Sequence, residues 1–403
     1  MLEKRVWRDF AIVTFSIAMV GIGLGSTLPL TALVLDARGF GPEVVGWMLS
    51  ALALGGLVGA IAAPAATQRF GRPRLMFACL VLLGLSVMPL QYVTSLWSWA
   101  ALRFLFGVAI APVFVLGESW INVLASDAVR GRVVAIYSTS FTLSQVLGPP
   151  LVDVLMRYQD QAFLICSGLF LLGTPVMLLA SNEAMQMTPR PDHDDSDHHR
   201  NKRYSDKDAT SSWLAIIRTA PALIAGVAFF ALFDNVALSF LPLFALDQGF
   251  SQSRALTAVT LVLAGDATLQ LIVGWLADRY GRARIHLLCG VLICLLLPLL
   301  SVMIGIAGVW MIYFYLLGGI AGSIYTLCLI ASGERFSGTA LLRASGLMSI
   351  TWNIASSTGS AATGVVMQWF GASTMTAVLW LVAAGFLVTL WKERNKQFVQ
   401  HIG

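Results

Sequence analysis

The chain has 403 residues, of which 57% are hydrophobic and only 12% are charged, and its formal net charge is +5. A soluble protein of this length carries many more charged side chains on its surface, so the composition excludes a water-soluble globular protein. Apolar stretches of about 20 residues, the length that crosses a hydrocarbon core of about 30 Å, recur along the whole chain. The sequence therefore predicts an all-α integral membrane protein.

Twelve membrane-spanning helices are expected. The first follows a basic start, but its apolar run is too long for a signal peptide and lacks a small-residue cleavage site. The predicted spans are residues 10–35, 43–66, 75–94, 98–122, 133–156, 162–181, 213–240, 254–276, 285–304, 307–331, 341–366 and 372–391.

The basic residues predict the orientation of these helices. Of the 26 Lys and Arg, only Arg38, Arg157 and Arg254 fall in the odd-numbered connections, and Arg103 lies inside the fourth span. Under the positive-inside rule, both termini should lie in the cytoplasm, and we expect a multi-pass protein of a bacterial inner membrane. Because the charges are dispersed over short segments, no nucleic-acid partner is expected.

A polar segment divides the chain into two similar halves. Residues 183–212 contain clustered Asp and His and cannot bury apolar surface, so they predict a flexible cytoplasmic linker. Its His193, His198 and His199 could instead bind a metal ion weakly, although the solvated linker is favoured and no metal site is expected. The expected domains are a six-helix bundle at residues 1–182, the linker at 183–212, a second six-helix bundle at 213–391 and a cytoplasmic tail at 392–403.

Short motifs repeat in the same order in both halves. The Leu-Pro-Leu at 28–30 recurs at 241–243, an offset of 213 residues. The Gly-Phe at 39–40 recurs at 249–250, and the Arg-rich segment 69–74 recurs at 279–284, both at an offset of 210. A duplicated six-helix unit follows, which is how many secondary transporters build alternating access.

The second Arg-rich segment carries the more complete motif. A glycine is followed four residues later by Asp-Arg and then by Gly-Arg, and this pattern resembles the cytoplasmic loop motif of the major facilitator superfamily. The first copy has Pro64 in place of the glycine and Gln68 in place of the acid. The residues assigned to this gate motif are Arg69, Gly71, Arg72, Gly274, Asp278, Arg279, Gly281 and Arg282.

Two further patterns support the resemblance. Arg103 and Gly107 resemble the Arg-x-x-x-Gly pattern of the family, which implies a part in proton transfer. Gly148 and Pro149 resemble the core of the pattern in antiporting members, although Ala135 and Ser144 stand where that pattern has its upstream glycines. The resemblance implies two pseudo-symmetric six-helix bundles around a central cavity.

The two glycine turns should define tight hairpins, since glycine allows positive φ. Asp278 lies at the C-terminal end of a helix, where its own helix dipole favours cations, so it should find a cation partner. We expect an interhelical clamp with Arg335 or Arg343. Because Gln68 removes the matching acid, the cytoplasmic gate should be held mainly by the second half.

Ionisable residues inside predicted spans are candidates for function because charges within a bilayer are costly. Asp266 lies about 18 Å into its span, near the bilayer midplane, and the offset of 210 places Gly56 at the matching position of the first half. It is expected to couple protons or bind substrate, with a static bond to Gln270 as the alternative. Asp234 could face the cavity or the extracellular gate equally well, and Asp153 is expected to be solvated.

The remaining candidates lie on the helices expected to line the cavity. Arg103 either functions in transport or extends to the interface, and Glu118 either clamps Arg69 or Arg72 or binds substrate or protons. Three further residues could either line the cavity or only pack between helices: Gln145, Trp352 and Asn353.

Other features set the expected class of function. The cysteines lie inside apolar stretches, which predicts buried thiols, and the nucleophile and metal motifs of membrane enzymes are missing, so neither an enzyme nor a cofactor is expected. The leading hypothesis is a monomeric, proton-coupled secondary transporter that exports a small organic molecule. A proton-coupled importer or a uniporter is the first alternative, and a non-transporting sensor is the second.

Overall fold

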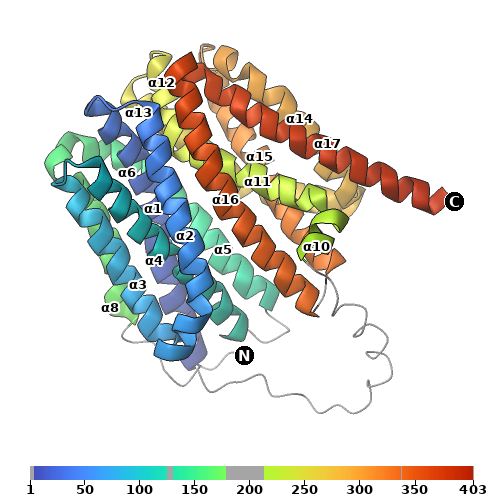
Figure 1. The fold of residues 1–403 in the computed structure, drawn as a ribbon, viewed down its shortest axis with the longest axis horizontal. Helices are drawn as coiled ribbons and strands as arrows, with labels where there is room; N and C mark the ends of the chain where they lie inside the picture. Colours follow the sequence, from blue (N-terminus) through green and yellow to red (C-terminus); the bar gives the residue numbers. More distant parts are fainter. Residues whose placement is uncertain (1–3, 125–129, 178–212, 337, 403) are drawn as a thin grey trace.

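The computed structural model describes residues 4–124, 130–177, 213–336 and 338–402 (Figure 1). Within these ranges the chain forms helices joined by short turns and no β-strand, which confirms the all-α fold class. The predicted linker, with its three histidines, lies outside the described residues.

The first half contains the helices that precede the linker. They are α1 (Lys4–Ala37), α2 (Pro42–Phe70), α3 (Arg72–Val87), the 3₁₀ turn η1 (Met88–Gln91), α4 (Leu96–Leu124), α5 (Arg130–Val146), α6 (Gly148–Leu155), the 3₁₀ turn η2 (Met156–Gln161), α7 (Ala162–Leu172) and α8 (Thr174–Met177).

The second half repeats this order. Its elements are α10 (Trp213–Thr219), α11 (Pro221–Asn235), the π-helical segment η4 (Val236–Phe240), α12 (Leu241–Asp247), α13 (Gln252–Tyr280), α14 (Arg282–Met303), α15 (Val309–Arg335), α16 (Gly338–Phe370), the 3₁₀ turn η5 (Ala372–Thr374) and α17 (Met375–Ile402). The last helix was predicted to end at residue 391, but it continues to Ile402.

Nine helices within the described ranges are long and apolar enough to cross a membrane. Three of the twelve predicted spans do not reach this measure. The fifth is divided at Leu147 into α5 and α6, and the sixth comprises the short helices α7 and α8. The eleventh, α16, has 33 residues but contains five Ser and four Thr. The described helices are therefore consistent with a twelve-helix chain.

Matching helix pairs pack in both halves. α2 packs on α4 and α1 on α5 in the first half, as α13 packs on α15 and α11 on α16 in the second. The closest approaches also repeat: a Cβ added at Gly55 or Gly107 would overlap the facing backbone, and so would one at Gly265 or Gly318. The duplication predicted from the short motifs is thus present in the packing.

The turns between helices confirm the predicted hairpins. Gly71 and Gly281 join α2 to α3 and α13 to α14 with φ of 81° and 97°. The end of the molecule at which these two glycines turn is called the hairpin end. Gly39 and Gly249, with φ of 81° and 83°, turn at the opposite end. All four positions require a residue that tolerates positive φ.

The halves meet mainly where α2 lies against α16 and where α13 lies against α5 and α6. At the opposite end, a Cβ added at Gly364 of α16 would lie 2.5 Å from the carbonyl oxygen of Pro42. Ser50 donates a hydrogen bond of 2.6 Å to the carbonyl of Ser357 further along the same pair. Figure 1 shows α2 and α16 side by side at the top and separated at the bottom. The two halves are therefore closed at the opposite end and spread at the hairpin end.

Candidate functional site

Arg103 is buried inside the first half. Only 1% of its surface is exposed, and its Nη2 donates to the carbonyl oxygen of Thr27 on α1 at 3.3 Å. Its guanidinium lies 5.8 Å from the ring centroid of Phe106, while Nε and Nη1 have no partner among the described residues. The alternative that Arg103 extends to the interface is therefore wrong.

The Gly148–Pro149 break allows α6 to approach α1 closely. A Cβ added at Gly148 would overlap the backbone of Gly25, and Ser26 Oγ donates to the carbonyl of Gly148 at 3.4 Å. Gln145, just before the break, is buried, and its carbonyl oxygen lies against Gly25. The antiporter-like motif thus forms a backbone-to-backbone contact that excludes any side chain at position 148.

Asp266 lies on α13 where this helix packs on α15. Its Oδ1 occupies the space beside Gly322, where an added Cβ would overlap the carboxylate. The predicted static partner, Gln270, instead accepts a hydrogen bond of 2.9 Å from Thr326. Among the described residues, no hydrogen bond or ion pair to Asp266 is found.

Asp234 lies at the point where the seventh predicted span loses regular α-helical geometry. The π-helical segment η4 begins two residues later, and Pro242 in the next turn lacks an N–H for the backbone ladder. The neighbouring Asn235 donates to the carbonyl of Ala231 at 2.8 Å and to Ser356 Oγ at 2.9 Å. Asp234 therefore lies beside a local distortion that is stabilised from α16.

Asp234 and Asp266 are close enough to interact electrostatically. The repeat offsets of 213 and 210 place Gly21 and Gly56 at the matching positions of the first half. Both carboxylates thus belong to the second half and replace glycines of the first.

Three aromatic side chains of the second half contact one another beside these acids. Phe230 of α11 stacks on Tyr325 of α15 with ring centroids 5.2 Å apart. Trp352 of α16 lies 5.8 Å from Phe230 and 5.3 Å from Tyr325. Phe230 is one helical turn from Asp234, and Tyr325 is one turn from Gly322.

Sequence reasoning identified Trp352 but missed Phe230 and Tyr325. Both lie on strongly apolar helices, where an aromatic residue is equally suited to packing or to lipid contact. The duplication offers no signal for them because their role comes from contact among three separate helices.

Glu118 joins this group from the first half. It interacts electrostatically with Tyr137 of α5 and with Tyr325 of α15, and therefore lies between the halves. Arg69, one of the two hairpin arginines that were predicted to contact Glu118, lies over the ring of Phe70 at 5.5 Å. A position between the halves fits the other alternative for Glu118, the binding of substrate or protons, which stays a prediction.

Asn353 lies at the contact between α16 and α2. Its Nδ2 donates to the carbonyl of Ser349 at 2.9 Å, and a Cβ added at Gly56 would lie 2.5 Å from its Oδ1. The absence of a side chain at position 56 is therefore required for this approach. Asn353, like Trp352 next to it, belongs to the surface where the halves meet.

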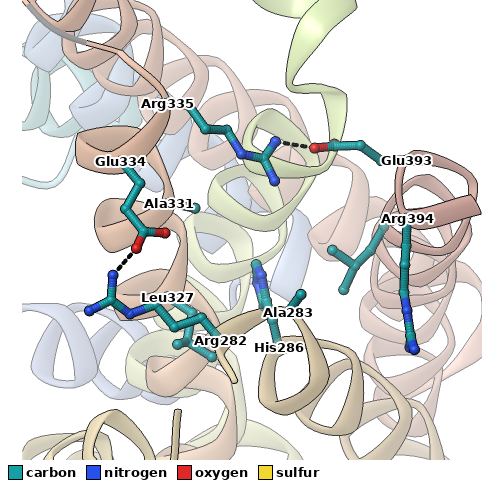
Figure 2. A pocket seen from close by; sticks show the side chains of 10 residues that line it. Arg282, Ala283, His286, Leu327, Ala331, Glu334, Arg335, Glu393 and Arg394 are labelled. Carbon is teal, nitrogen blue, oxygen red and sulfur yellow. Dashed lines mark hydrogen bonds and ion pairs between the residues drawn. The ribbon is translucent and has the colours of Figure 1, made fainter. Parts of the chain in front are cut away.

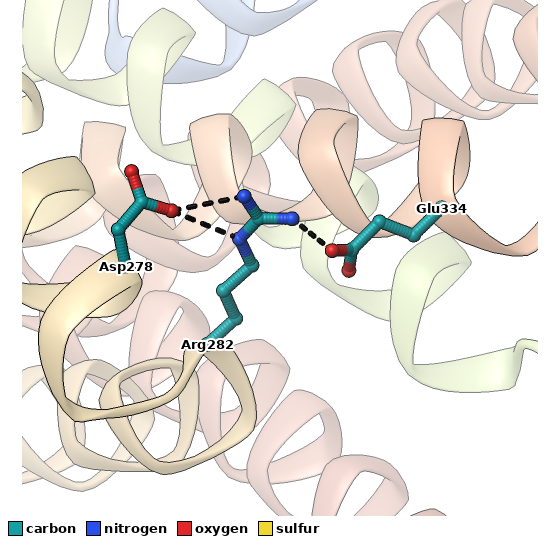
Figure 3. Close-up of polar contacts among 3 residues, drawn as sticks. All are labelled: Asp278, Arg282 and Glu334. Carbon is teal, nitrogen blue, oxygen red and sulfur yellow. Dashed lines mark hydrogen bonds and ion pairs between the residues drawn. The ribbon is translucent and has the colours of Figure 1, made fainter.

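Asp278 makes a different ion pair from the one predicted. Arg282, on the other side of the same hairpin, donates to Asp278 Oδ1 through Nη2 at 2.9 Å and Nε at 3.2 Å (Figure 3). The Nη1 of Arg282 also binds Glu334 of α15. Of the two predicted partners of Asp278, Arg335 is therefore wrong, and Arg282 links the hairpin to α15.

Arg335 has its own partner. It binds Glu393 of α17 (Figure 2). The Glu393 carboxylate also accepts a hydrogen bond of 3.2 Å from the backbone N–H of Ala222. Since Ala222 lies in the first turn of α11, Glu393 satisfies a free N–H at that helix start and connects three helices. Figure 2 shows these side chains around a small pocket at the hairpin end, with His286 and Arg394 also in its lining.

Other gate residues show how the hairpin is held. Arg279 lies over the rings of Trp275 and Tyr280 at 5.4 and 5.6 Å, as Arg69 lies over Phe70 in the first half. A Cβ added at Gly274 would meet no atom within 4 Å, so packing does not require glycine there in this conformation.

Metal binding receives no support from the described part of the chain. No group of three or more His, Cys, Asp or Glu side chains is arranged to hold a metal ion there. The five cysteines are free, and four of them are buried.

Comparison with known proteins agrees with the fold and the motifs. The family profile described as Major Facilitator Superfamily matches residues 10–264 and 223–397. An uncharacterized MFS-type transporter, YfkF of Bacillus subtilis (strain 168), is 22% identical over 397 residues, which cover 96% of each chain.

Two solved structures have the same fold. The D-xylose-proton symporter has a TM-score of 0.71 at 15% identity and covers 96% of this chain and 98% of its own. The nucleoside transporter NupG has a TM-score of 0.70 at 14% identity, with 97% and 98% covered. The profile match spans nearly the whole chain, and the repeated hairpins and paired halves agree with it. This chain therefore belongs to the major facilitator superfamily and is a membrane transport protein, not an enzyme.

Proposed function

We propose that this protein exports a small organic solute across the bacterial inner membrane by alternating access, in exchange for protons. The observation that carries the proposal is the pair of interacting carboxylates, Asp234 and Asp266, on membrane-spanning helices of the second half. Neither has an ion-pair partner among the described residues. Carboxylates in such a setting are suited to binding a proton in one state and releasing it in another.

The arrangement of the halves supports alternating access. The α2–α16 contact closes the molecule at the opposite end, while the helices spread at the hairpin end. The positive-inside rule assigns the hairpin end to the cytoplasm. On that orientation the structure corresponds to an inward-facing state that would receive a solute from the cytoplasm.

The direction of transport has a second candidate. The similar fold of the D-xylose-proton symporter favours a proton-coupled importer. The backbone contact of Gly148 with Gly25 favours exchange, because this break resembles the motif of antiporting members. We therefore place export first and proton-coupled import second.

Reconstituted vesicles that contain a pH-sensitive dye distinguish these candidates. Solutes from several classes are added under an imposed pH gradient, and the movements of solute and protons are recorded together. Exchange predicts that a transported solute and protons move in opposite directions, and that Asp266→Asn abolishes this linkage. Joint movement in one direction would favour import. Solute movement that is unaffected by the gradient and by Asp266→Asn would refute proton coupling.

A further inference from the structure

The contacts among Phe230, Tyr325 and Trp352 form one continuous group with three acids. Phe230 shares a helix face with Asp234, Tyr325 lies one turn from the Gly322 that contacts Asp266, and Tyr325 also interacts with Glu118. This group is called the central cluster and consists of Phe230, Tyr325, Trp352, Asp234, Asp266 and Glu118. Both halves contribute to it.

The charged side chains of the central cluster all have the same sign. Its charged members are all acidic, and Arg103 bonds to Thr27 on α1 inside the first half. No Lys or Arg contact with Asp234 or Asp266 is found within the described ranges. The negative faces of aromatic rings and the carboxylates of Asp234 and Asp266 both attract positive charge.

The aromatic rings are placed to receive a ligand. Tyr325 and Trp352 remain partly exposed although their helices pack in the interior, whereas Phe230 is buried behind them. The three rings come from three different helices and meet within 5.2 to 5.8 Å. Such a convergent set of rings recognises cations with dispersed charge.

The amide side chains around the cluster are partly bonded within the protein. Asn235 donates to Ala231 and Ser356, Asn353 donates to Ser349, and Gln270 accepts from Thr326. A sugar or nucleoside needs many donors and acceptors that are free to bind hydroxyl groups. Asn235, next to Asp234, has its Nδ2 bonded to both Ala231 and Ser356 and offers mainly its Oδ1 to such hydroxyl groups.

The hydroxyl of Tyr137, beside the cluster, has no hydrogen bond within the described part of the chain. The hydroxyl of Tyr137 lies against Gly117, next to Glu118, and only 4% of this residue is exposed. Because a buried hydroxyl is costly to leave unsatisfied, it indicates where a polar group of a ligand or a water would bond.

We infer that the central cluster binds a hydrophobic organic cation, held by the rings of Tyr325 and Trp352, which Phe230 supports from behind, and by the carboxylates of Asp234 and Asp266. This inference rests on the proposed transport function, for which it names the class of solute. The cation and a proton would then compete for the same carboxylates, and this competition would couple export of the cation to entry of the proton.

The test measures equilibrium binding of radiolabelled tetraphenylphosphonium to the purified full chain in lipid nanodiscs at one fixed pH. We expect saturable binding that neutral triphenylphosphine oxide does not displace. Asp234→Asn and Asp266→Asn should each weaken binding about tenfold or more, and Trp352→Ala about tenfold. Trp352→Phe, which keeps an aromatic face, should retain most of the affinity and shows that the loss is not one of folding.

Matched controls remove the same chemical groups elsewhere. Trp97→Ala, at a side chain that is 87% exposed, and Asp247→Asn, at the exposed end of α12, should leave binding unchanged. No saturable binding, equal displacement by the neutral analogue, or unchanged affinity in both Asp266→Asn and Trp352→Ala would overturn the inference.

The same vesicles separate this inference from the proposed function. If xylose or uridine moves with a linked proton flux while tetraphenylphosphonium does not bind, the solute class is wrong and the transport proposal stands. If tetraphenylphosphonium binds with the expected pattern but its movement ignores the pH gradient, the solute class stands and proton exchange is wrong.

Discussion

At the residue scale, Gly322 determines where the carboxylate of Asp266 lies. The carboxylate occupies the space that a Cβ at position 322 would fill, so even the smallest side chain must displace it. In the first half the acid is replaced by Gly56, so this arrangement has no counterpart there. The position of the acid therefore depends on a glycine of another helix.

Gly322→Ala is expected to abolish proton-linked transport while leaving the acid itself in the chain. The added methyl group overlaps Asp266 Oδ1 and should force the side chain into another rotamer. The measurement is proton flux in the vesicle assay, with expression and thermal stability recorded in parallel. Gly385→Ala is the control, since a Cβ there meets no atom within 4 Å. Normal flux in Gly322→Ala would show that the precise position of Asp266 is unimportant.

Individual residues also explain which parts of the site could be predicted. The hairpin glycines were predictable because positive φ is a local requirement that only a few residue types satisfy. The ion pairs of the hairpin were not, because helix rotation decides whether Glu334 or Arg335 of α15 faces the hairpin. Adjacent residues on α15 point about 100° apart, so Glu334 faces the hairpin while Arg335 faces α17.

At the element scale, Glu393 connects α17, α15 and the start of α11. Its side chain is 9% exposed and accepts from both Arg335 and the Ala222 N–H, whereas the pair between Arg282 and Glu334 is about half exposed. Burial makes the loss of one partner costly, while an exposed pair is weakened by water and salt. The two ion pairs of the hairpin end should therefore contribute unequally to stability.

Glu393→Gln is expected to destabilise the second half by about 2 kcal/mol, because it leaves Arg335 without its counter-charge. Glu334→Gln, the matched change in the exposed pair, should cost under about 1 kcal/mol. Thermal unfolding of the two purified variants in the same detergent provides the comparison. Equal losses in both variants would contradict the assignment of Glu393 as the stronger link.

Elements also limit what the sequence could reveal about the fold. Long apolar runs predicted most helices because hydrophobic length alone identifies a membrane span. Hydrophobic length did not predict the division of the fifth span at Leu147 or the π-helical segment η4, since both depend on prolines and on contacts with neighbouring helices. The central cluster was only partly predicted because its members come from separate helices.

At the scale of the whole molecule, small residues allow the halves to close at the opposite end. Gly46 of α2 faces the carbonyl of Ser360, and a Cβ there would lie 2.6 Å from that oxygen. Gly364 makes the reciprocal approach from α16 to Pro42, and Ser50 bonds to Ser357 one turn beyond Gly46. This contact joins the two halves directly, so its strength affects the equilibrium between the state open at the hairpin end and the state open at the opposite end.

Gly46→Val is expected to shift the protein toward a state that is open at the opposite end. The branched side chain cannot fit against Ser360 when α2 and α16 are in contact, whereas separation of the halves relieves the overlap. Single cysteines introduced near residues 42 and 364 would report the shift as faster labelling by a membrane-impermeant thiol reagent. Gly385→Val, at a position with open space around it, should leave the labelling rate unchanged. If labelling in Gly46→Val stays at the original rate and the protein is folded, the α2–α16 contact does not control access at that end.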